Sequence, residues 1–457
     1  MSSPVRIEKS GPARFLTILA LAAPSLLAQE ALTLRQAVNL ALHSNPLVAA
    51  ADAGEKEAEA RIHQAHSGFL PRLQFSESIQ RGNNPVFVFG SLLTQHQFSA
   101  ENFAIDALNR PDALSNHQSQ LIVEQVIFDA RQTSRSVEAA RFIRQMAGED
   151  TRRSQSDITL NVLRAYFGVV LAEKNLEVAR QSVDSARADL ERAEFIYQSG
   201  RSTQADVLAV RVHLAAMQEE RIRASNDVAV TRATLNDALG VSLDRTFELT
   251  TPLEPGTGEP DGTFEEYRHL AAEDRPEIRQ ADLAQSLARA EQQIAVAKYW
   301  PQVAFEGIVE ADRQNVFGKG GVNWFAAVTL RWELWNGGET KARVEQARFA
   351  ESRAEALRKH ADSAIHLEVR KAYLDLSAAA QRVEVASAAA AEAEEAHRII
   401  QNRHQAGLIT VTELLRSEVA LATARTRRLA AVYDHRIAIA ALEHAAGTLA
   451  ADSAAVN

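Results

Sequence analysis

Cysteine is absent from the 457-residue sequence. Its absence excludes disulfides, thiolate metal sites, cysteine-dependent catalysis and a lipid-modified N-terminal cysteine. Aromatic residues make up only 6% of the chain, whereas Ala, Glu, Arg, Leu and Gln dominate its long middle sections. That composition is typical of long helices and coiled coils rather than of a mixed globular core.

The chain also lacks an excess of basic residues, and its formal net charge is −9 at pH 7. This acidic balance argues against nucleic acid as a partner, since nucleic-acid binding requires a basic face. The sequence also offers no convergent set of nucleophile, base and metal ligands. We therefore predict no enzymatic activity, no bound cofactor and no metal site.

An apolar run at the N-terminus predicts export. Three basic residues precede residues 15–28, an apolar segment of about 14 residues that contains Pro24 and ends in the small residue Ala28. The alternative, an N-terminal membrane anchor, requires roughly 20 residues. We therefore assign residues 1–28 to a signal peptide. The remaining chain has no apolar stretch of spanning length, so it is soluble in the periplasm, secreted, or inserted as a β-barrel.

The sequence contains an internal repeat of about 200 residues. Two glycines interrupt otherwise helical segments, and Gly407 in HQAGLITVTELLRSEVAL lies 207 residues (407 − 200) after Gly200 in IYQSGRSTQADVLAVRV. Nearer the start of each repeat, Pro71 and Pro301 correspond at an offset of 230 (301 − 71). The register therefore slips by 23 residues (230 − 207) between residues 71 and 128, which predicts a surface insertion in the first repeat.

Each repeat predicts the same succession of elements. A helix begins at a proline, Pro46 or Pro276, where the fixed φ favours the first helical turn. Two strands, a long helix and, beyond the glycine, a return helix follow. A long helix of this length extends about 100 Å, far beyond a globular core. The predicted bounds are strands within 72–128, a long helix over 131–198 and a return helix over 203–240 in the first repeat (29–240); strands within 302–335, a long helix over 338–405 and a return helix over 410–447 in the second (276–449); a linker and equatorial region at 241–275; and a tail at 450–457.

The strand predicted over 321–335, GVNWFAAVTLRWELW, carries the membrane signal. Trp324 and Trp332 share its apolar face and lie eight residues, or roughly 26 Å, apart. This distance matches the apolar band of roughly 25 Å between the aromatic girdles of an outer-membrane barrel. The alternative is a strand of a soluble sandwich in which both tryptophans are buried. Four strands cannot close a barrel, which needs about eight, so several protomers would share one, and three would supply twelve strands.

The ordered set of features, present twice, resembles the TolC-type outer-membrane efflux family over residues 32–449. The resemblance is carried by the helix, strand, strand, long helix, turn and helix order and by Pro71 and Pro301 before the strands. It is also carried by LWNGGE after the last strand, by the turns YQSG…ADVL and HQAG…TELL, and by LTLRQAVNLALHSNP near the N-terminus.

The resemblance implies a mainly α-helical homotrimer, in which a twelve-stranded outer-membrane β-barrel continues into a twelve-helix periplasmic barrel. It implies a passive channel of a tripartite efflux or type I secretion system. The expected partners are outer-membrane lipid, a periplasmic adaptor (membrane fusion) protein and an inner-membrane pump. The alternative function is a periplasmic coiled-coil adaptor or scaffold without a membrane barrel.

By position, the resemblance implies a periplasmic constriction next to the tip turns at Gly200 and Gly407. Asp206 and Glu413 stand six residues after these glycines, where the family often has an acid. Threefold symmetry would turn each into a ring that favours cations. The alternative is that both are ordinary first-turn acids that complement a helix N-terminus.

Three further positions at the turns differ from some relatives. His404 stands where those relatives have a tyrosine, which the first repeat keeps as Tyr197, and Arg416 replaces a second acid. We expect Arg416 to pair with the Glu413 ring or to cancel its charge. If His404 faces Asp206, opening would depend on pH near the ordinary histidine pKa of about 6.5; the alternative is a plain surface histidine.

The extra residues of the first repeat lie within 84–116. This segment resembles a loop found in part of the family, which implies a position at the extracellular rim. Its many apolar residues predict that it folds over the mouth of the barrel.

Overall fold

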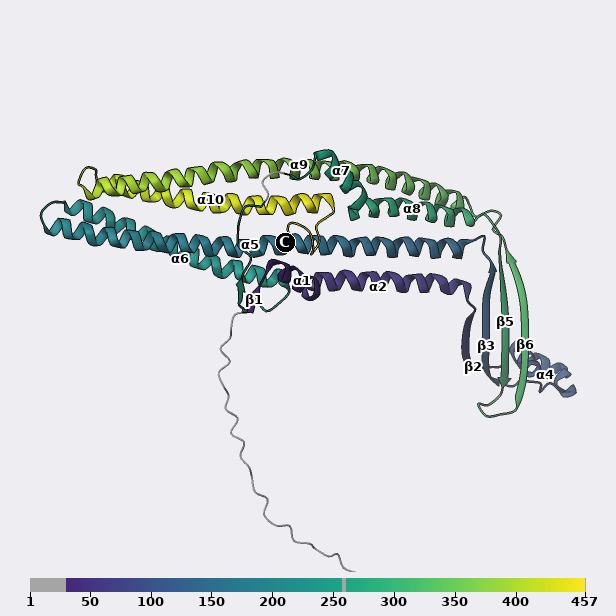
Figure 1. Ribbon diagram of the computed structural model, residues 1–457. Helices are drawn as coiled ribbons and strands as arrows, with labels where there is room; N and C mark the ends of the chain where they lie inside the picture. Colours follow the sequence, from purple (N-terminus) through teal and green to yellow (C-terminus); the bar gives the residue numbers. More distant parts are fainter. Residues whose placement is uncertain (1–29, 257–259, 457) are drawn as a thin grey trace, which may run out of the picture.

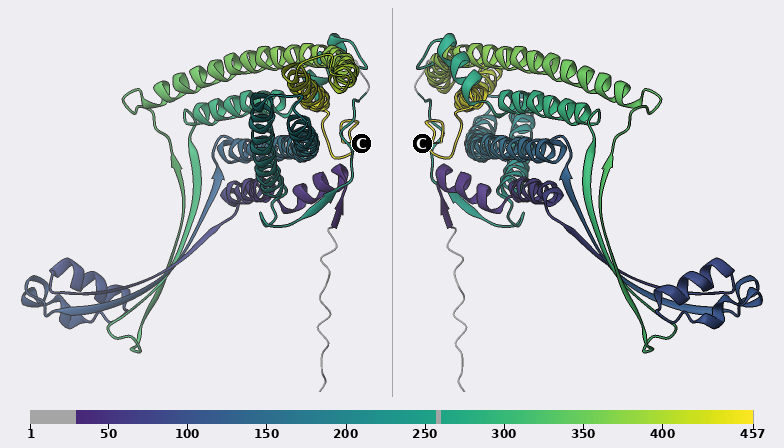
Figure 2. Two further views of the ribbon diagram at one scale, coloured as in Figure 1. Left: turned by 90° about the vertical axis from the view of Figure 1, so that its left-hand side faces the viewer. Right: turned by 90° about the vertical axis from the view of Figure 1, so that its right-hand side faces the viewer.

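The computed structural model describes residues 30–256 and 260–456. Long helices lie side by side over most of the molecule, and a four-stranded sheet extends from one end of them (Figure 1). Views along the helices show the strands twisting away from the helical part (Figure 2). The signal peptide expected at 1–28 lies outside the described residues.

Two helices of 67 residues each run the length of the helical part (Figure 1). Each measures about 100 Å at 1.5 Å per residue. Each packs against a return helix over one part of its length and against a shorter helix over the rest. Within the described residues, we find no helix whose length and apolar character would allow it to cross a bilayer. The long helices are α5 (Gln132–Gln198) and α9 (Glu339–Gln405), the return helices α6 (Gln204–Leu239) and α10 (Val411–Ala446), and the shorter ones α2 (Pro46–His66) and α8 (Pro276–Ala297).

The long helices begin one residue later than predicted, and the return helices differ from the predicted bounds by one residue at each end. Arg131 and Gly338 adopt left-handed conformations, with φ of 68° and 87°, and are the N-caps of the long helices. The return helices are shorter at both ends, because the predicted first residue is a threonine N-cap and the predicted last residue a glycine C-cap with positive φ. Capping chemistry therefore fixes these boundaries.

A further helix precedes the first proline of each repeat. Helix α1 (Leu34–Ser44) begins after Thr33, and α7 (Phe264–Asp274) begins after Thr263, 230 residues later (263 − 33). In both, the threonine side chain accepts a hydrogen bond from the backbone of the third helical residue, and the side chain of that residue accepts one from the threonine backbone. Helix α7 lies in the region that the sequence analysis assigned to the linker at 241–275.

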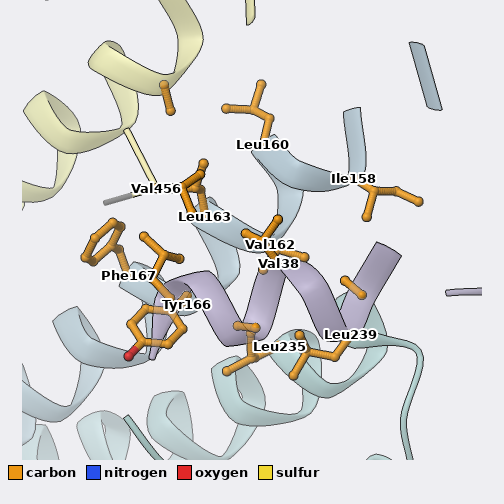
Figure 3. Packing of buried hydrophobic residues seen from close by; sticks show 14 of the residues in the cluster. Val38, Ile158, Leu160, Val162, Leu163, Tyr166, Phe167, Leu235, Leu239 and Val456 are labelled. Carbon is orange, nitrogen blue, oxygen red and sulfur yellow. The ribbon is translucent and has the colours of Figure 1, made fainter. Parts of the chain in front are cut away.

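The main apolar core lies where α1, α5 and α6 meet (Figure 3). Tyr166 and Phe167 of α5 are fully buried there, and Val456 near the C-terminus joins them. The Tyr166 hydroxyl donates to the Leu32 carbonyl (2.8 Å) and accepts from the Thr251 amide (2.9 Å). It thereby fixes a parallel strand pair beside the core, β1 (Glu30–Leu32) with β4 (Phe247–Leu249).

The strands of both repeats form one antiparallel sheet in the order β2-β3-β5-β6. Strands β2 and β6 are the edges of this sheet and have no further strand beside them in the described chain. The bounds are β2 (Arg72–Gly82), β3 (Leu114–Phe128), β5 (Gln302–Arg313) and β6 (Gly320–Arg331).

The last strand is shorter than predicted. Strand β6 ends at Arg331, which pairs with Gln302, the first residue of β5. Pro301 precedes Gln302 and has no amide hydrogen with which to extend the ladder. Trp332 therefore lies beyond the strand, 53% exposed, and donates its Nε1 hydrogen to the Tyr299 carbonyl (3.1 Å). The prediction that Trp324 and Trp332 occupy one continuous strand was wrong.

The register sets an apolar row on one face of the sheet against a polar row on the opposite face. Phe75, Leu121, Val309 and Trp324 form one row across the four strands, and all four side chains are exposed. The adjacent row, which points to the opposite face, consists of Ser76, Gln120, Glu310 and Asn323. Two such rows, one apolar and one polar on opposite faces, are typical of strands that lie between lipid and a wet interior.

The insertion of the first repeat is folded into helices. It contains α3 (Pro85–Thr94), the 3₁₀ helix η2 (Ala100–Phe103) and α4 (Ile105–Asn109). These helices lie at the end of the sheet that is remote from the long helices (Figures 1 and 2). Strands β5 and β6 are joined at the same end by a short connection, residues 314–319.

Candidate functional site

The reversal after α5 is a Schellman turn centred on Gly200. Gly200 has φ of 76°, a conformation that residues with a Cβ rarely adopt. Its amide donates to the Tyr197 carbonyl (2.9 Å), and the Arg201 amide donates to the Ile196 carbonyl (3.1 Å). These two hydrogen bonds satisfy carbonyls that the helix end leaves unpaired.

The reversal after α9 repeats this geometry. Gly407 has φ of 74°, its amide donates to the His404 carbonyl (2.9 Å), and the Leu408 amide donates to the Arg403 carbonyl (2.9 Å). Both turns lie at the end of the molecule opposite the sheet (Figure 1). The two breaks identified in the sequence are therefore equivalent helix reversals at one tip.

Asp206 is part of the N-terminal cap of α6. Its carboxylate accepts hydrogen bonds from the Thr203 hydroxyl (2.8 Å), the Thr203 amide (3.1 Å) and the Ser202 hydroxyl (2.9 Å). The Thr203 side chain in turn accepts from the Asp206 amide (3.2 Å). The Thr203 and Ser202 hydrogen bonds hold the pKa of Asp206 below its ordinary value. Within one protomer, Asp206 thus stabilises the start of α6.

Glu413 occupies the same position in α10 but forms no N-terminal cap with the preceding threonine. The N-cap Thr410 makes no side-chain capping hydrogen bond, and Glu413 is exposed in the first turn. Arg416 is exposed one turn later, and the described residues contain no ion pair between Glu413 and Arg416. The two hairpin tips therefore share their backbone fold but present different side chains to solvent.

His404 lies between the two hairpins near the tip. It is half-buried in the last turn of α9 and interacts electrostatically with Arg192 of α5 and Asp206 of α6. Burial and then Arg192 lower the pKa of His404, and the opposing effect of Asp206 is smaller. The imidazole therefore charges only below the pH near 6.5 that the sequence analysis assigned to it. Tyr197, the corresponding residue of the first repeat, is 45% exposed.

A buried ionisable cluster lies further along the hairpins, and the sequence analysis missed it. His213 of α6 lies 2.9 Å from Glu418 of α10, and Ser185 of α5 donates to the other Glu418 oxygen (2.8 Å). Asp189 of α5 lies beside Glu418 and 3.5 Å from Arg192. The cluster joins the first hairpin, α5 and α6, to the second through α10.

The two carboxyl groups of this cluster titrate differently. Burial and then the neighbouring Glu418 carboxyl raise the pKa of Asp189 to about 7. Burial would also raise the pKa of Glu418, but contacts with His213, Asp189 and Ser185 outweigh it and lower that pKa. The two carboxyl groups therefore carry one negative charge below about pH 7, where Asp189 is protonated, and two negative charges above it.

A signal for this cluster is present in the sequence. Val183, Ala186 and Asp189 are all buried and follow one another at three-residue spacing, so they share one face of α5. A carboxylate on the apolar stripe of a helix predicts a buried partner. The identity of that partner, 229 residues away (418 − 189), depends on how the hairpins pack.

Comparison with known proteins places this architecture among channels. The family model described as outer membrane efflux protein matches residues 37–241 and 268–448. The chain is 26% identical over 434 residues to the alkaline protease secretion protein AprF of Pseudomonas aeruginosa, which covers 92% of this chain and 85% of that protein. It is 26% identical over 424 residues to Protein CyaE of Bordetella pertussis, with 92% and 84% covered. The fold is similar to the CmeC outer membrane channel of Campylobacter jejuni, with a TM-score of 0.79, 15% identity, and coverage of 92% and 87%.

Proposed function

The chain belongs to the outer membrane efflux protein family, and we propose that it forms a passive homotrimeric duct that receives its cargo from an inner-membrane pump. It is an outer-membrane channel whose helical part extends into the periplasm. The alternative of a periplasmic adaptor or scaffold is not favoured by these similarities. Within this function, transport energy comes from the pump, and the duct needs no cofactor of its own.

The observation that carries the proposal is the open four-stranded sheet. Its edges, β2 and β6, lack a neighbouring strand in the described chain, and one of its faces exposes a row that includes Phe75, Val309 and Trp324. Unpaired edges and exposed apolar rows are unstable in water and are satisfied when a barrel closes in a membrane. Three protomers would supply twelve strands, enough for such a barrel.

We place the outer-membrane girdle at Trp324 and Trp332 and the periplasmic constriction at the tip turns. Trp324 is 80% exposed on the apolar face, and Trp332 lies where the sheet joins the helices. At the other end, Asp206, Glu413 and Arg416 stand beside the turns that would ring the entrance. In a threefold-symmetric trimer each of these charged residues would form a ring of three around the entrance, and such rings would select ions by the sign of their charge.

We infer that the cargo is a polypeptide and that the partners are a periplasmic adaptor and a pump of type I secretion. The similarity to the alkaline protease secretion protein AprF over 92% of this chain supports this choice. The experiment is complementation of a strain that lacks the channel of a protease exporter. Recovery of protease in the culture medium supports protein export; intracellular retention together with restored drug resistance would favour small-molecule efflux instead.

The barrel is tested by cross-linking, for which the absence of cysteine provides a clean background. Ser78→Cys in β2 is combined in turn with Asn323→Cys, Ala327→Cys and Thr329→Cys in β6, which scans the unknown register between protomers. We expect one combination to give a covalent trimer that thiol reduction dissolves. The single variants serve as controls, and monomers from every combination would contradict the shared barrel.

A further inference from the structure

The insertion between β2 and β3 is attached to the sheet through a buried polar chain. Gln95, which follows α3, donates its Nε2 hydrogens to the Ser115 carbonyl (3.1 Å) and to Asn116 Oδ1 (2.8 Å). Asn116 of β3 donates to Asp312 of β5 (2.6 Å). Gln95 and Asp312 are each 1% exposed and Asn116 is 7% exposed. Such complete burial of polar groups indicates a fixed contact rather than a loose loop.

The same segment reaches across the sheet to β6. Asn323 of β6 donates to the Thr94 carbonyl (3.0 Å), and its amide oxygen lies 3.1 Å from His96 Nε2. Gln97 donates to the Lys319 carbonyl in the turn before β6 (2.9 Å). The end of α3 thus contacts β3, β5 and β6, and it does so where these strands are farthest from the long helices.

The register decides which face of the sheet the insertion covers. Asn323 belongs to the row that runs through Gln120 and Glu310 on the polar face, and Asp312 lies two residues from Glu310, on that same face. Trp324 and the apolar row point the other way. The insertion therefore packs on the face that a closed barrel turns away from lipid.

We propose that the segment 84–113, the mouth insert, lies inside the extracellular end of the channel and sets the size limit of what passes there. This inference rests on the proposed trimeric barrel, because only a closed barrel makes the polar face a lumen. Threefold symmetry places three mouth inserts around one axis. Their edge-to-face ring contacts, Phe89 with Phe98 and Phe98 with Phe103, give each insert a small core of its own.

Gly321 supplies a substitution that should release the mouth insert. It lies in β6 on the polar face, and a Cβ at this position would collide with the Thr94 carbonyl oxygen and lie 2.8 Å from the His96 ring. Alanine fits a strand, so Gly321→Ala should leave β6 in place and push the insert away. Gly318→Ala, in the adjacent turn, meets its nearest atoms at 3.4 Å or more and is the matched control.

The experiment measures single-channel conductance of purified trimers in planar bilayers. The proteins are the full chain, Gly321→Ala, Gly318→Ala, and a variant in which a short Gly-Ser linker replaces residues 84–113. We expect the replacement to raise conductance, because the mouth and the tip constriction are resistances in series along one pore and removing either lowers the total. Gly321→Ala should shift conductance in the same direction, and Gly318→Ala should match the full chain.

A second readout uses cells that produce each protein. Loss of the mouth insert should sensitise them to a glycopeptide antibiotic too large for ordinary porins, and Gly318→Ala should not. Trimers whose conductance is equal in all four proteins would overturn the role of the mouth insert and leave the duct intact. Failure of the full chain to form trimers would instead overturn the proposed function itself.

Discussion

The imidazole Nε2 of His213 in α6 lies 2.9 Å from a carboxylate oxygen of Glu418 in α10, and both side chains are only 9% exposed. This contact crosses from one helical hairpin to the other. Any motion that separates the hairpins must break it and expose both side chains to water. The surrounding groups, Ser185, Asp189 and Arg192, all come from α5, so three helices meet at this point.

The first prediction concerns Asp189. In the folded chain its pKa is about 7, against an ordinary value of 3.8, so the folded state holds more protons between these values. Stability therefore falls as the pH rises through this range. Asp189→Asn cannot ionise, so we expect a flatter pH profile and, at pH 8, a gain on the order of 1 kcal/mol.

Denaturant unfolding followed by circular dichroism between pH 4 and 8 measures this effect. Asp184→Asn is the control, because it changes a carboxylate of the same helix that is 76% exposed. If the stability of Asp189→Asn changes with pH in parallel with that of the unchanged chain, the extra proton of the folded state is bound by a group other than Asp189.

A second prediction separates Asp206 from Glu413. Asp206 caps α6 through three accepted hydrogen bonds, so Asp206→Ala should cost about 1 kcal/mol of stability. Glu413 has no such role in α10, so Glu413→Gln should leave the melting temperature unchanged and reduce cation preference if the acid ring is present. Melting curves and reversal potentials in a salt gradient give the two readouts. Equal melting losses for both variants would contradict the difference between the caps.

A third prediction concerns His444 near the middle of the molecule. Its Nε2 lies 2.8 Å from Asp157 of α5 and its Nδ1 3.8 Å from Glu368 of α9. Burial lowers the pKa of His444, but the hydrogen bonds with Glu368 and Asp157 outweigh burial and raise it above 6.5. The charged ring therefore contributes its full stabilisation below pH 6.5, and this is lost as the pH rises through the raised pKa.

His444→Gln should accordingly destabilise the protein by about 1–2 kcal/mol at pH 6 and by less at pH 9. Thermal melting across this range is the measurement. His269→Gln removes a histidine that is 73% exposed and lies 3.6 Å from Glu273, and it should change little. A His444→Gln deficit that stays constant with pH would indicate lost packing rather than lost charge.

The fourth prediction concerns the tip glycines. Gly200 and Gly407 have φ of 76° and 74°, and a Cβ at either would meet open space. Replacement by alanine should therefore cost about 1–2 kcal/mol through backbone strain alone. Gly168→Ala in the interior of α5, also in open space but with ordinary helical φ, should instead gain about 0.5–1 kcal/mol. The measurement is the free energy of unfolding of the three variants. A loss for Gly200→Ala and Gly407→Ala together with a gain for Gly168→Ala would assign the loss to the positive φ, because none of the three added Cβ atoms meets a neighbour.

The helical part was accessible from the sequence because local rules determine it. Apolar periodicity, a proline at the first turn and a glycine at the reversal each act within a few residues. The long helices consequently end at Gln198 and Gln405, as the sequence analysis expected. Helix α7 was missed because its capping threonine, Thr263, stands in a stretch rich in proline and glycine.

The remaining features depend on partners distant in the chain. The end of β6 is set by Pro301 on the neighbouring strand, and the Asp189 environment by Glu418 on another hairpin. The segment 84–116 was expected at the rim from the family resemblance, but its contacts with Asn323 require the register of a sheet that joins both repeats. Pairing between repeats is not encoded in any single window of sequence.

The parallel pair of β1 and β4 also constrains the order in which the protein can mature. Glu30 pairs with Phe247, and Val456 joins the same apolar core. A chain that emerges from the inner membrane N-terminus first therefore leaves β1 without its partner until more than half of the residues have crossed. The core is completed only when Ala455 and Val456 have also crossed. Chains that stall before residue 456 would therefore remain open to periplasmic proteases, so protease resistance would appear only after this residue has crossed.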